Sequence, residues 1–259
     1  MNKENKFIFS INTGRAGSEY LALLLSMTQE CQSFHEAYPN FAGDPIRKFN
    51  TLGPENTLDL QRIKINQILN DCSSGKPIYA DTSHVFIKSW YYAAVKDLRN
   101  ISVIWLRRNS QETINSLLRL NTIPDKSLSA RNWYLRTDYP FNLTAPPKNR
   151  TNKALCEWYV EEIETRAQKF HQTYPHIPFY EVWLHDLNSE ENVLNLLRGL
   201  HLTPLLEIKK IIGVKKNLKT EARLTIYEKI KRHLRIGLIR LNFLKSKDRL
   251  HIKGDGLYS

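Results

Sequence analysis

Two short segments of the chain carry residue types that bind anions. The first follows the apolar run 6–11 and contains Thr13, Gly14, Arg15, Ala16, Gly17 and Ser18. Glycines let backbone N–H groups approach an anion, and the N-terminus of the helix expected over 18–27 carries partial positive charge. Arg15 adds a charge that can fork two hydrogen bonds onto a phosphate or sulfate. We predict a phosphate- or sulfate-binding loop with Ser18 as helix N-cap; the alternative is a tight turn with an exposed Arg15.

The second segment follows the apolar, β-branched run 101–106, which is typical of a buried strand. Arg107 and Arg108 come directly after this run, and Ser116 lies eight residues beyond Arg108 on an expected helix. Ligands of open α/β sheets bind at the carboxyl ends of the strands. Arg108 and Ser116 are therefore predicted to hold a second phosphate; the alternative is a solvated strand end followed by a neutral helix position.

Several common site patterns are missing from the sequence. The loop at 13–18 has no Gly-Lys-Ser/Thr, which disfavours a magnesium-dependent NTPase, and it lacks the G-x-G-x-x-G dinucleotide pattern. Cys31, Cys72 and Cys156 lie far apart and fit neither a disulfide framework nor a zinc site. We expect no metal, and we expect the cysteines to be small buried apolar residues.

Apolar periodicity and turn residues predict how these segments are positioned. Strands alternate with helices along the chain, which indicates an α/β fold with a mostly parallel sheet flanked by helices. We expect strands over 6–11, 32–36, 77–80, 101–106 and 178–183, and helices over 18–27, 58–70, 85–98, 110–120, 153–174 and 190–199. The segments 39–57 and 124–150 are expected to be loops.

Taken together, the two anion-binding segments resemble the cofactor loops of the sulfotransferases that use 3'-phosphoadenosine 5'-phosphosulfate (PAPS). In that family a (K/R)-x-G-(T/S) loop grips the 5'-phosphosulfate, and an Arg with a Ser eight residues later binds the 3'-phosphate. Here Arg15 to Ser18 match the first motif, and Arg108 with Ser116 match the second. The resemblance covers about residues 6–218. It implies a P-loop-NTPase-like three-layer architecture, PAPS as sulfuryl donor, PAP as product, and no metal.

The chain departs from the family pattern at three places. Glu19 stands where the family often has a second Thr, and the Arg-Lys-Gly loop of the cytosolic branch is missing, with Lys215, Lys216 and Asn217 as a weak substitute. The range 79–87 has no Lys, which disfavours the heparan-type branch, where this segment carries a catalytic Lys.

Sulfuryl transfer requires a cation near the leaving oxygen and a base for the acceptor proton. The resemblance assigns the first role to Arg15. For the base we favour Glu36, with His35 second, because they follow a short expected strand soon after the loop. An exposed His-Glu pair is the alternative. Asp81 or His84, after the next strand, could also orient the acceptor or act as base, although capping of the following helix is the preferred interpretation for that segment.

The 259-residue chain has a formal net charge of +12, which predicts anionic partners. Much of the excess lies between Lys219 and Lys253, with 11 basic and three acidic residues. We expect a sulfotransferase domain over 1–218 and a basic helical extension over 219–259 that packs on the same domain. A secondary contact of this helix with an acidic acceptor or an anionic surface is the alternative. Specific nucleic-acid binding is not expected, because stacking aromatics are not interleaved with the basic residues.

The sequence shows neither a signal peptide nor a membrane span, so we expect a cytoplasmic protein. The acceptor stays open among carbohydrate, lipid, phenol and tyrosine, with a mild preference for a carbohydrate or glycolipid from the basic surface and the aromatics of the 124–150 loop. Two other functions remain: a P-loop-type phosphotransferase, and a non-catalytic binder of anionic surfaces that uses the basic tail.

Overall fold

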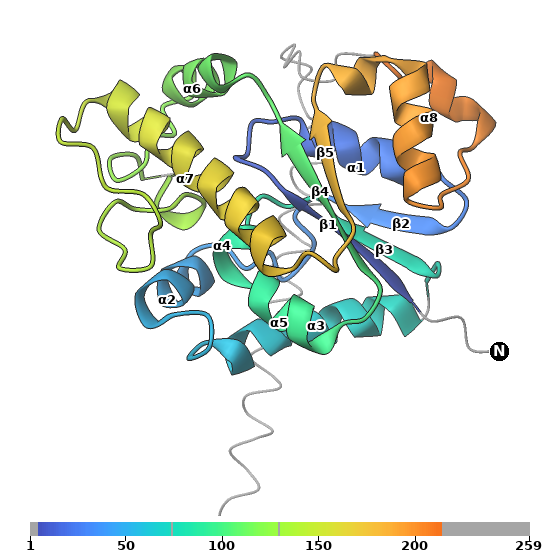
Figure 1. Cartoon of the computed structure of the whole chain (residues 1–259), viewed down its shortest axis with the longest axis horizontal. Coiled ribbons are helices and arrows are strands. Elements are labelled where there is room, and N and C mark those ends of the chain that lie inside the picture. The colour runs from blue at the N-terminus through green and yellow to red at the C-terminus, as the bar shows by residue number, and fades with distance from the viewer. Residues whose placement is uncertain (1–4, 74, 129, 214–259) are drawn as a thin grey trace, which may run out of the picture. The chain divides into compact units, whose positions relative to one another are not determined.

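The computed structural model describes residues 5–73, 75–128 and 130–213, which belong to one compact unit, Met1–Lys215. Its centre is a five-stranded parallel sheet with the order β2-β3-β1-β4-β5 (Figure 1). The strands are β1 (Lys6–Ile11), β2 (Cys31–Phe34), β3 (Ile78–Asp81), β4 (Ile101–Arg107) and β5 (Phe179–Trp183). The predicted α/β fold class and parallel sheet are confirmed.

The strand register brings the predicted site segments to one edge of the sheet. In β1, Phe9 lies opposite Asp81 of β3, and Ile11 lies opposite Trp105 of β4. In β2, Phe34 also lies opposite Asp81. Because all strands run in the same direction, the loops that leave β1, β2, β3 and β4 emerge at the same carboxyl edge.

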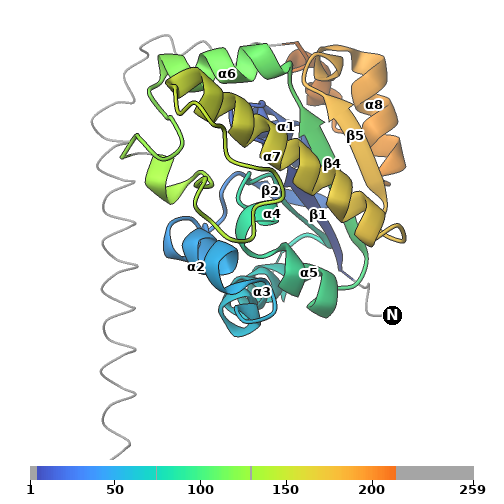
Figure 2. The same ribbon diagram turned by 60° about the vertical axis from the view of Figure 1, so that its left-hand side comes forward.

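Helices cover both faces of the sheet, so the unit has three layers (Figures 1 and 2). Strand residues alternate between the two cores: Phe7 and Phe9 lie in one, and Ile8 lies in the other. The face of Ile8 is covered by α1 (Ser18–Ser26) and α8 (Glu190–Gly199). The opposite face is covered by α3 (Leu58–Ser73), α4 (Phe86–Ser89), α5 (Tyr91–Asp97), α6 (Ser110–Arg119) and α7 (Asn152–Thr173).

Two of the expected elements are wrong. The range 39–57, predicted as loop, contains the helix α2 (Asp44–Leu52), which begins after Gly43 and buries Ile46 and Phe49. Its Pro and Gly signals mark the two ends of a helix rather than a continuous loop. The helix expected over 85–98 is divided into α4 and α5, because Trp90 leaves the helical conformation and its fully buried ring packs edge-on against Phe9 and Phe86.

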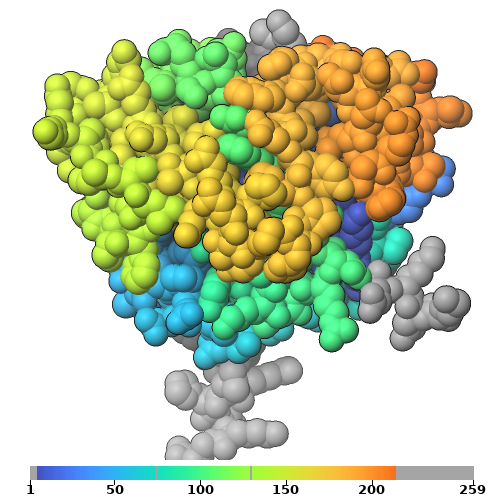
Figure 3. Space-filling view, viewed as in Figure 1, coloured from blue at the N-terminus to red at the C-terminus, as the bar shows by residue number. Residues whose placement is uncertain are grey.

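The segment 124–150 is irregular as predicted, apart from the 3₁₀ turn η1 (Ala130–Asn132). Buried Glu162 of α7 holds it in place by accepting hydrogen bonds from the backbone N–H groups of Leu143 and Thr144. Arg166, one turn further along α7, binds the same carboxylate at 2.6 Å. Together with α7, this segment forms the yellow and yellow-green part of the surface in Figure 3.

Some predictions fall outside the described residues. The basic extension 219–259 and the weak substitute loop at Lys215, Lys216 and Asn217 lie in this part of the chain. Among the helices that are described, none has the length and apolar composition that crossing a bilayer requires. All three cysteines are buried with free thiols, as predicted.

Candidate active site

The loop after β1 has a backbone conformation suited to an anion. Gly14 (φ 71°), Arg15 (φ 57°) and Gly17 (φ 89°) are all left-handed. Turns of this kind point successive N–H groups into one concavity. A side chain at Gly17 is disfavoured on two grounds, because its φ strains other residues and because its Cβ would lie 2.4 Å from Leu184 Cδ1, so that the leucine side chain would have to move.

Ser18 does not have the capping role predicted for it. It is the first residue of α1, and Gly17 occupies the N-cap position, where no side chain caps the helix. The first-turn N–H groups of α1 therefore have no side-chain cap from the described residues. Uncapped N–H groups at a helix N-terminus form an anion-binding site together with the helix dipole.

The structure brings the two predicted anion-binding segments together. The Arg108 guanidinium follows β4 and donates to the backbone carbonyl of Arg15 at 3.0 Å and to Glu112 at 2.9 Å. The Arg15 Nε atom donates to the hydroxyl of Ser116 on α6 at 3.4 Å. Ser116 is 5% exposed, so its hydroxyl faces the loop rather than open solvent. The carboxyl edges of β1 and β4 thus share one cationic site.

Arg107, the neighbour of Arg108, is held away from this site. Its guanidinium pairs with Glu164 and Glu181, each at 2.6 Å, and lies 4.3 Å from the ring centres of Trp105 and Trp183. With two carboxylates and two rings around it, Arg107 joins β4 to β5 and α7. Of the two arginines, only Arg108 contacts the loop.

His35 and Glu36 lie beside the loop, directly after β2. His35 Nε2 is 3.5 Å from a Glu36 carboxylate oxygen, and His35 Nδ1 is 3.4 Å from the hydroxyl of Thr82. Thr82 donates a hydrogen bond to the carbonyl of Ser18 at 2.8 Å. The two side chains are 27% and 29% exposed, so an acceptor can reach them from solvent.

Asp81 does not reach an acceptor. Its fully buried carboxylate pairs with the equally buried Lys64 at 3.0 Å and accepts a hydrogen bond from the N–H of Ser83 at 2.9 Å. Lys64 also donates to the carbonyl of Ala37. The Lys64–Asp81 ion pair thus holds the segment that follows β2 against the end of β3. The predicted capping role of Asp81 or Ser83 is wrong, because the N-cap of α4 is Val85.

His84 lies directly under the loop. A Cβ at Gly14 would be only 3.2 Å from His84 Nδ1, so a glycine there allows the ring to pack against the loop backbone. The ring is 6% exposed and lies nearly parallel to Trp133 at 5.7 Å. Its Nε2 atom has no hydrogen-bond partner among residues 5–73, 75–128 and 130–213.

A buried lysine, four residues after His84 in the sequence, completes the site. Lys88 lies on α4, which packs between β1 and α7 (Figure 2). Its Nζ atom is 2.6 Å from His84 Nδ1 and 3.1 Å from the hydroxyl of Tyr159 on α7. Tyr159 in turn donates to the carbonyl of Thr13 at 2.8 Å. A continuous chain of polar contacts therefore joins the loop, through Tyr159 and Lys88, to His84.

Burial shifts the proton equilibria of this cluster. It lowers the pKa of His84 well below its usual range, and Lys88, His35 and Arg15 act in the same direction. Burial and Arg166 also lower the pKa of Lys88 well below its usual range, whereas Glu36 opposes this shift. The pKa of Tyr159 is raised by burial. These electrostatic couplings place Arg15, His35, Glu36, His84 and Lys88 in one environment.

Sequence reasoning missed Lys88 and Tyr159 as members of this site, whereas Trp133 belongs to the 124–150 loop whose aromatics were expected near the acceptor. Lys88 stands four residues after His84, in the first turn of the helix expected over 85–98. That spacing was the available signal, together with a lysine inside an apolar run. Tyr159 is 71 residues from Lys88, and no local pattern connects them.

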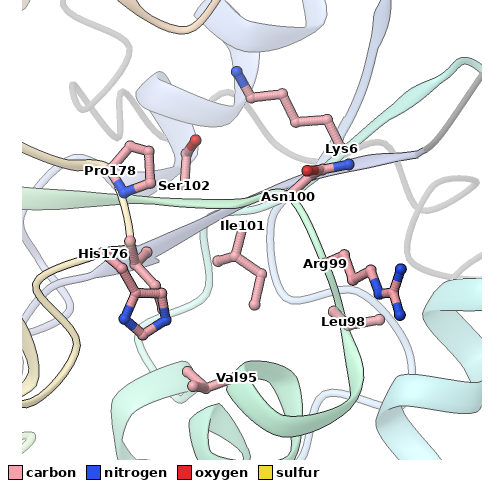
Figure 4. Close-up of a pocket in the computed structure, with 10 residues that line it drawn as sticks. Lys6, Val95, Leu98, Arg99, Asn100, Ile101, Ser102, His176 and Pro178 are labelled. Atoms are coloured by element: carbon pink, nitrogen blue, oxygen red, sulfur yellow. The ribbon is translucent and has the colours of Figure 1, made fainter.

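A separate cavity of about 570 Å³ opens at the opposite edge of the sheet, where β1, β4 and β5 begin. It is lined by the basic residues Lys6, Arg99 and His176 (Figure 4). The Lys6 amine points away from the other two in Figure 4 and donates to the carbonyl of Leu200 at 2.8 Å. The three basic side chains in Figure 4 do not converge on one point, unlike the residues around the loop after β1.

Comparison with known proteins finds similarity in structure only. No protein-family model and no curated protein matches the sequence. The sulfotransferase domain from the curacin biosynthetic pathway matches with a TM-score of 0.53 and 13% identity, over 80% of this chain and 77% of that domain. The sulfotransferase domain of the Synechococcus PCC 7002 olefin synthase matches with a TM-score of 0.47 and 15% identity, over 80% and 78%.

A third match is deoxyadenosine kinase from M. mycoides with bound dCTP, with a TM-score of 0.39 and 12% identity, over 75% of this chain and 98% of that one. At such identities the comparisons concern the fold alone. The curacin match, with its TM-score above 0.5, shows that this chain has the fold of a sulfotransferase domain.

Proposed function

We propose that this protein transfers a sulfuryl group from PAPS to an acceptor hydroxyl. The observation that carries the proposal is the meeting of Arg15, Arg108 and Ser116, which come from two segments about a hundred residues apart and share hydrogen bonds at one sheet edge. A single phosphate would need only the loop at 13–18. A second Arg and a Ser beside it fit a ligand that carries a further phosphate.

The residues of the site match the chemical groups of such a donor. The left-handed loop and the uncapped start of α1 supply N–H donors for a 5'-phosphosulfate. Arg108 and Ser116 are the proposed partners of the 3'-phosphate. No group of three His, Cys, Asp or Glu side chains able to hold a metal occurs among the described residues. The proposal assigns charge neutralisation to Arg15 and Arg108, which meet at the site.

Sulfuryl transfer is an in-line displacement at sulfur in which negative charge grows on the leaving phosphate oxygen. Arg15 lies at the N-terminus of α1, where its guanidinium and the helix dipole both favour that charge. The protein's remaining task is to align the acceptor hydroxyl and to remove its proton.

Two groups compete for the role of base. Glu36, which the sequence favours, is close to His35 and partly exposed. His84 has an unpartnered Nε2, packs against Gly14 of the loop, and has a pKa that burial lowers, so its ring is neutral and able to accept a proton near pH 7. We propose His84 as the base, with Glu36 and His35 orienting the acceptor from the β2 side.

Calorimetric titration with PAP tests the two-phosphate site through point variants. Arg108→Ala and Ser116→Ala should each weaken PAP binding, Arg108→Ala by roughly 10- to 100-fold, because hydrogen bonds to charged groups contribute about 1.5–3 kcal/mol. Arg119→Ala, an exposed arginine on the same helix as Ser116, is the matched control and should leave PAP binding unchanged. Equal PAP affinity for Arg108→Ala and wild type would contradict the assignment.

The acceptor proposed is a carbohydrate or another molecule with a flat face. Its support is the position of the partly exposed Trp133, whose ring centre lies 5.7 Å from that of His84. Sugars and rings pack well on aromatic side chains. Incubation of the protein with sulfur-35-labelled PAPS and a panel of oligosaccharides, glycolipids and phenols would identify the class, and transfer to phenols alone would exclude a sugar acceptor.

A further inference from the structure

Lys88 is buried among polar groups that lack a countercharge, which is typical of an amine that gains and loses a proton and not of a lysine in a structural ion pair. Its side chain is fully buried. Its Nζ atom has three polar neighbours: His84 Nδ1 at 2.6 Å, the Trp133 carbonyl at 2.5 Å and the Tyr159 hydroxyl at 3.1 Å. None of these is a carboxylate, and no ion pair of Lys88 exists within the described part of the chain. A permanent ammonium in such a place is costly.

The three contacts fit two protonation states with opposite consequences for His84. A charged Lys88 donates all three of its N–H bonds, so His84 Nδ1 must accept and Nε2 must carry the ring proton. His84 is then no base. A neutral Lys88 donates two N–H bonds, to Trp133 and Tyr159, and its lone pair accepts a hydrogen bond from His84 Nδ1–H. The Nε2 lone pair is then free for the acceptor proton.

The charges around Lys88 favour the neutral state. On α7, Arg166 adds positive charge, although it is paired with Glu162. From the loop after β1 and the end of β2, Arg15 and His35 act on His84, the direct partner of Lys88. Among the described residues, Glu36 is the carboxylate that favours the ammonium, and it is partly exposed. Burial is the largest influence, and it favours a neutral amine.

We propose that Lys88 is a positioning residue that holds His84 in the Nδ1–H form and receives that proton during the reaction. In the forward step the acceptor oxygen bonds to sulfur while the bond from sulfur to the bridging phosphate oxygen breaks, and its electron pair leaves on PAP. The acceptor O–H bond breaks in the same step, and the proton forms a new bond to His84 Nε2. The His84 Nδ1–H bond breaks, and that proton bonds to Lys88 Nζ. The pair gains one proton, which it releases to water after product leaves. This inference rests on the proposed function, with His84 as base.

The surroundings of Lys88 also stabilise the charge that the step creates. An amine is a stronger base than an imidazole by several pKa units, so the proton gained by the pair resides on Lys88. The new ammonium is met by the Trp133 carbonyl and by the rings of Tyr134 and Tyr159, whose centres lie 5.4 and 5.5 Å from Nζ. Lys88 thus has the orienting role that a carboxylate has in hydrolase triads.

Nitrogen-15 NMR of the histidine rings tests the proposal without an acceptor. The two ring nitrogens have different shifts when protonated and unprotonated, and the loss of one ring's signals in His84→Gln assigns His84. In the wild-type protein we expect His84 to be neutral from pH 6 to 8 with the proton on Nδ1. A proton on Nε2 over that range would overturn the proposal.

Variants of Lys88 test whether this lysine sets the tautomer. The arginine introduced in Lys88→Arg keeps a permanent charge, so its guanidinium should donate a hydrogen bond to His84 Nδ1. The proton of the His84 ring should then move to Nε2. Lys88→Met removes the partner, so the ring should lose its Nδ1–H preference, and turnover with any acceptor found should fall by roughly 100-fold. Lys96→Met, on exposed α5 surface, is the control. An unchanged His84 tautomer in Lys88→Arg and Lys88→Met would contradict the proposal, and the wild-type spectrum decides it if neither variant folds.

PAP titration separates this inference from the function on which it rests. Lys88→Met and Lys88→Arg should bind PAP as the wild type does, because Lys88 lies beneath the loop and not in it. If wild-type protein fails to bind PAP, the sulfotransferase proposal fails whatever the NMR result. If PAP binds and the wild-type ring carries its proton on Nε2, only the role of Lys88 fails.

Discussion

Two fully buried lysines lie behind the carboxyl edge of the sheet, and their partners differ. Lys64 of α3 has a carboxylate, Asp81, at 3.0 Å, a carbonyl at 2.8 Å, and the Trp90 ring at 5.3 Å. Lys88 of α4 has an imidazole, a carbonyl and a phenol, and no carboxylate. A buried charge with a matched countercharge serves the fold. A buried amine without one keeps a proton equilibrium that catalysis can use.

The largest expected effect is on stability and comes from breaking the Lys64–Asp81 pair. Lys64→Met or Asp81→Asn should lower the free energy of unfolding by about 3–5 kcal/mol, because each leaves one buried partner uncompensated. Urea denaturation followed by circular dichroism measures the loss.

The double variant Lys64→Met/Asp81→Leu supplies the control for that pair. It removes both charges, and it should recover most of the loss, since apolar replacements of buried ion pairs are often neutral. Single variants as stable as the wild type would show that the pair is not needed for folding, and the contrast between the two lysines would then fail.

A much smaller stability effect is expected at Lys88, with a distinct pH dependence. Burial lowers its folded-state pKa, so below the unfolded pKa of about 10.4 folding must release a proton, which costs free energy. This cost is full below the folded pKa and disappears as pH rises toward about 10.4. The variant Lys88→Met does not have this deprotonation cost, but it leaves the Trp133 carbonyl without its lysine donor. Because these two effects oppose each other, the free energy of unfolding of Lys88→Met at pH 7 should lie within about 2 kcal/mol of the wild-type value.

Urea denaturation at several pH values between 7 and 10 checks the sign. The wild type should gain stability relative to Lys88→Met as pH rises, by at most about 1.4 kcal/mol per pH unit. A loss relative to Lys88→Met over that range would mean that folding stabilises the ammonium, as expected for an ion-paired lysine.

The smallest effect is expected in acid and concerns His84. Its folded-state pKa is lowered by burial, so stability is lost as pH falls below the unfolded value of about 6.5 and down to the folded pKa. His84→Gln removes this contribution. The difference in unfolding free energy between wild type and His84→Gln should therefore shrink from pH 7 to pH 5, and thermal denaturation at fixed ionic strength measures it. A pH-independent difference would show that the ring titrates normally.

The strand, glycine turn and helix around the loop at 13–18 were predictable because they are local. They follow one another within 6–27, and Arg108 and Ser116 both follow a second strand, so parallel pairing brings the two segments to one edge of the sheet. Their direct contact through Arg15 was not predictable, because it depends on side-chain conformations. The prediction of Ser18 as N-cap was wrong because the turn ends one residue earlier than expected. Gly17 is the N-cap, and Ser18 is the first residue of α1.

The buried part of the site was beyond sequence reasoning. Asp81 was expected to orient the acceptor, act as base or cap the next helix, but its carboxylate pairs with Lys64, 17 positions earlier. Lys88 lay inside the helix expected over 85–98 and was given no role, and Tyr159 belonged to no motif. Such contacts are set by how α3, α4 and α7 pack on the sheet, and only the three-dimensional arrangement assigns them.

Calorimetric titration of the wild-type protein with PAP, AMP and ATP–magnesium tests the central claim most directly. The two-phosphate site predicts PAP binding at least 10-fold tighter than AMP binding, since AMP cannot contact Arg108 and Ser116 through a 3'-phosphate. It also predicts no preference for ATP–magnesium. Equal affinities for PAP and AMP, or no PAP binding by folded protein, would contradict a PAPS-dependent sulfotransferase, and tight ATP–magnesium binding would favour a phosphotransferase.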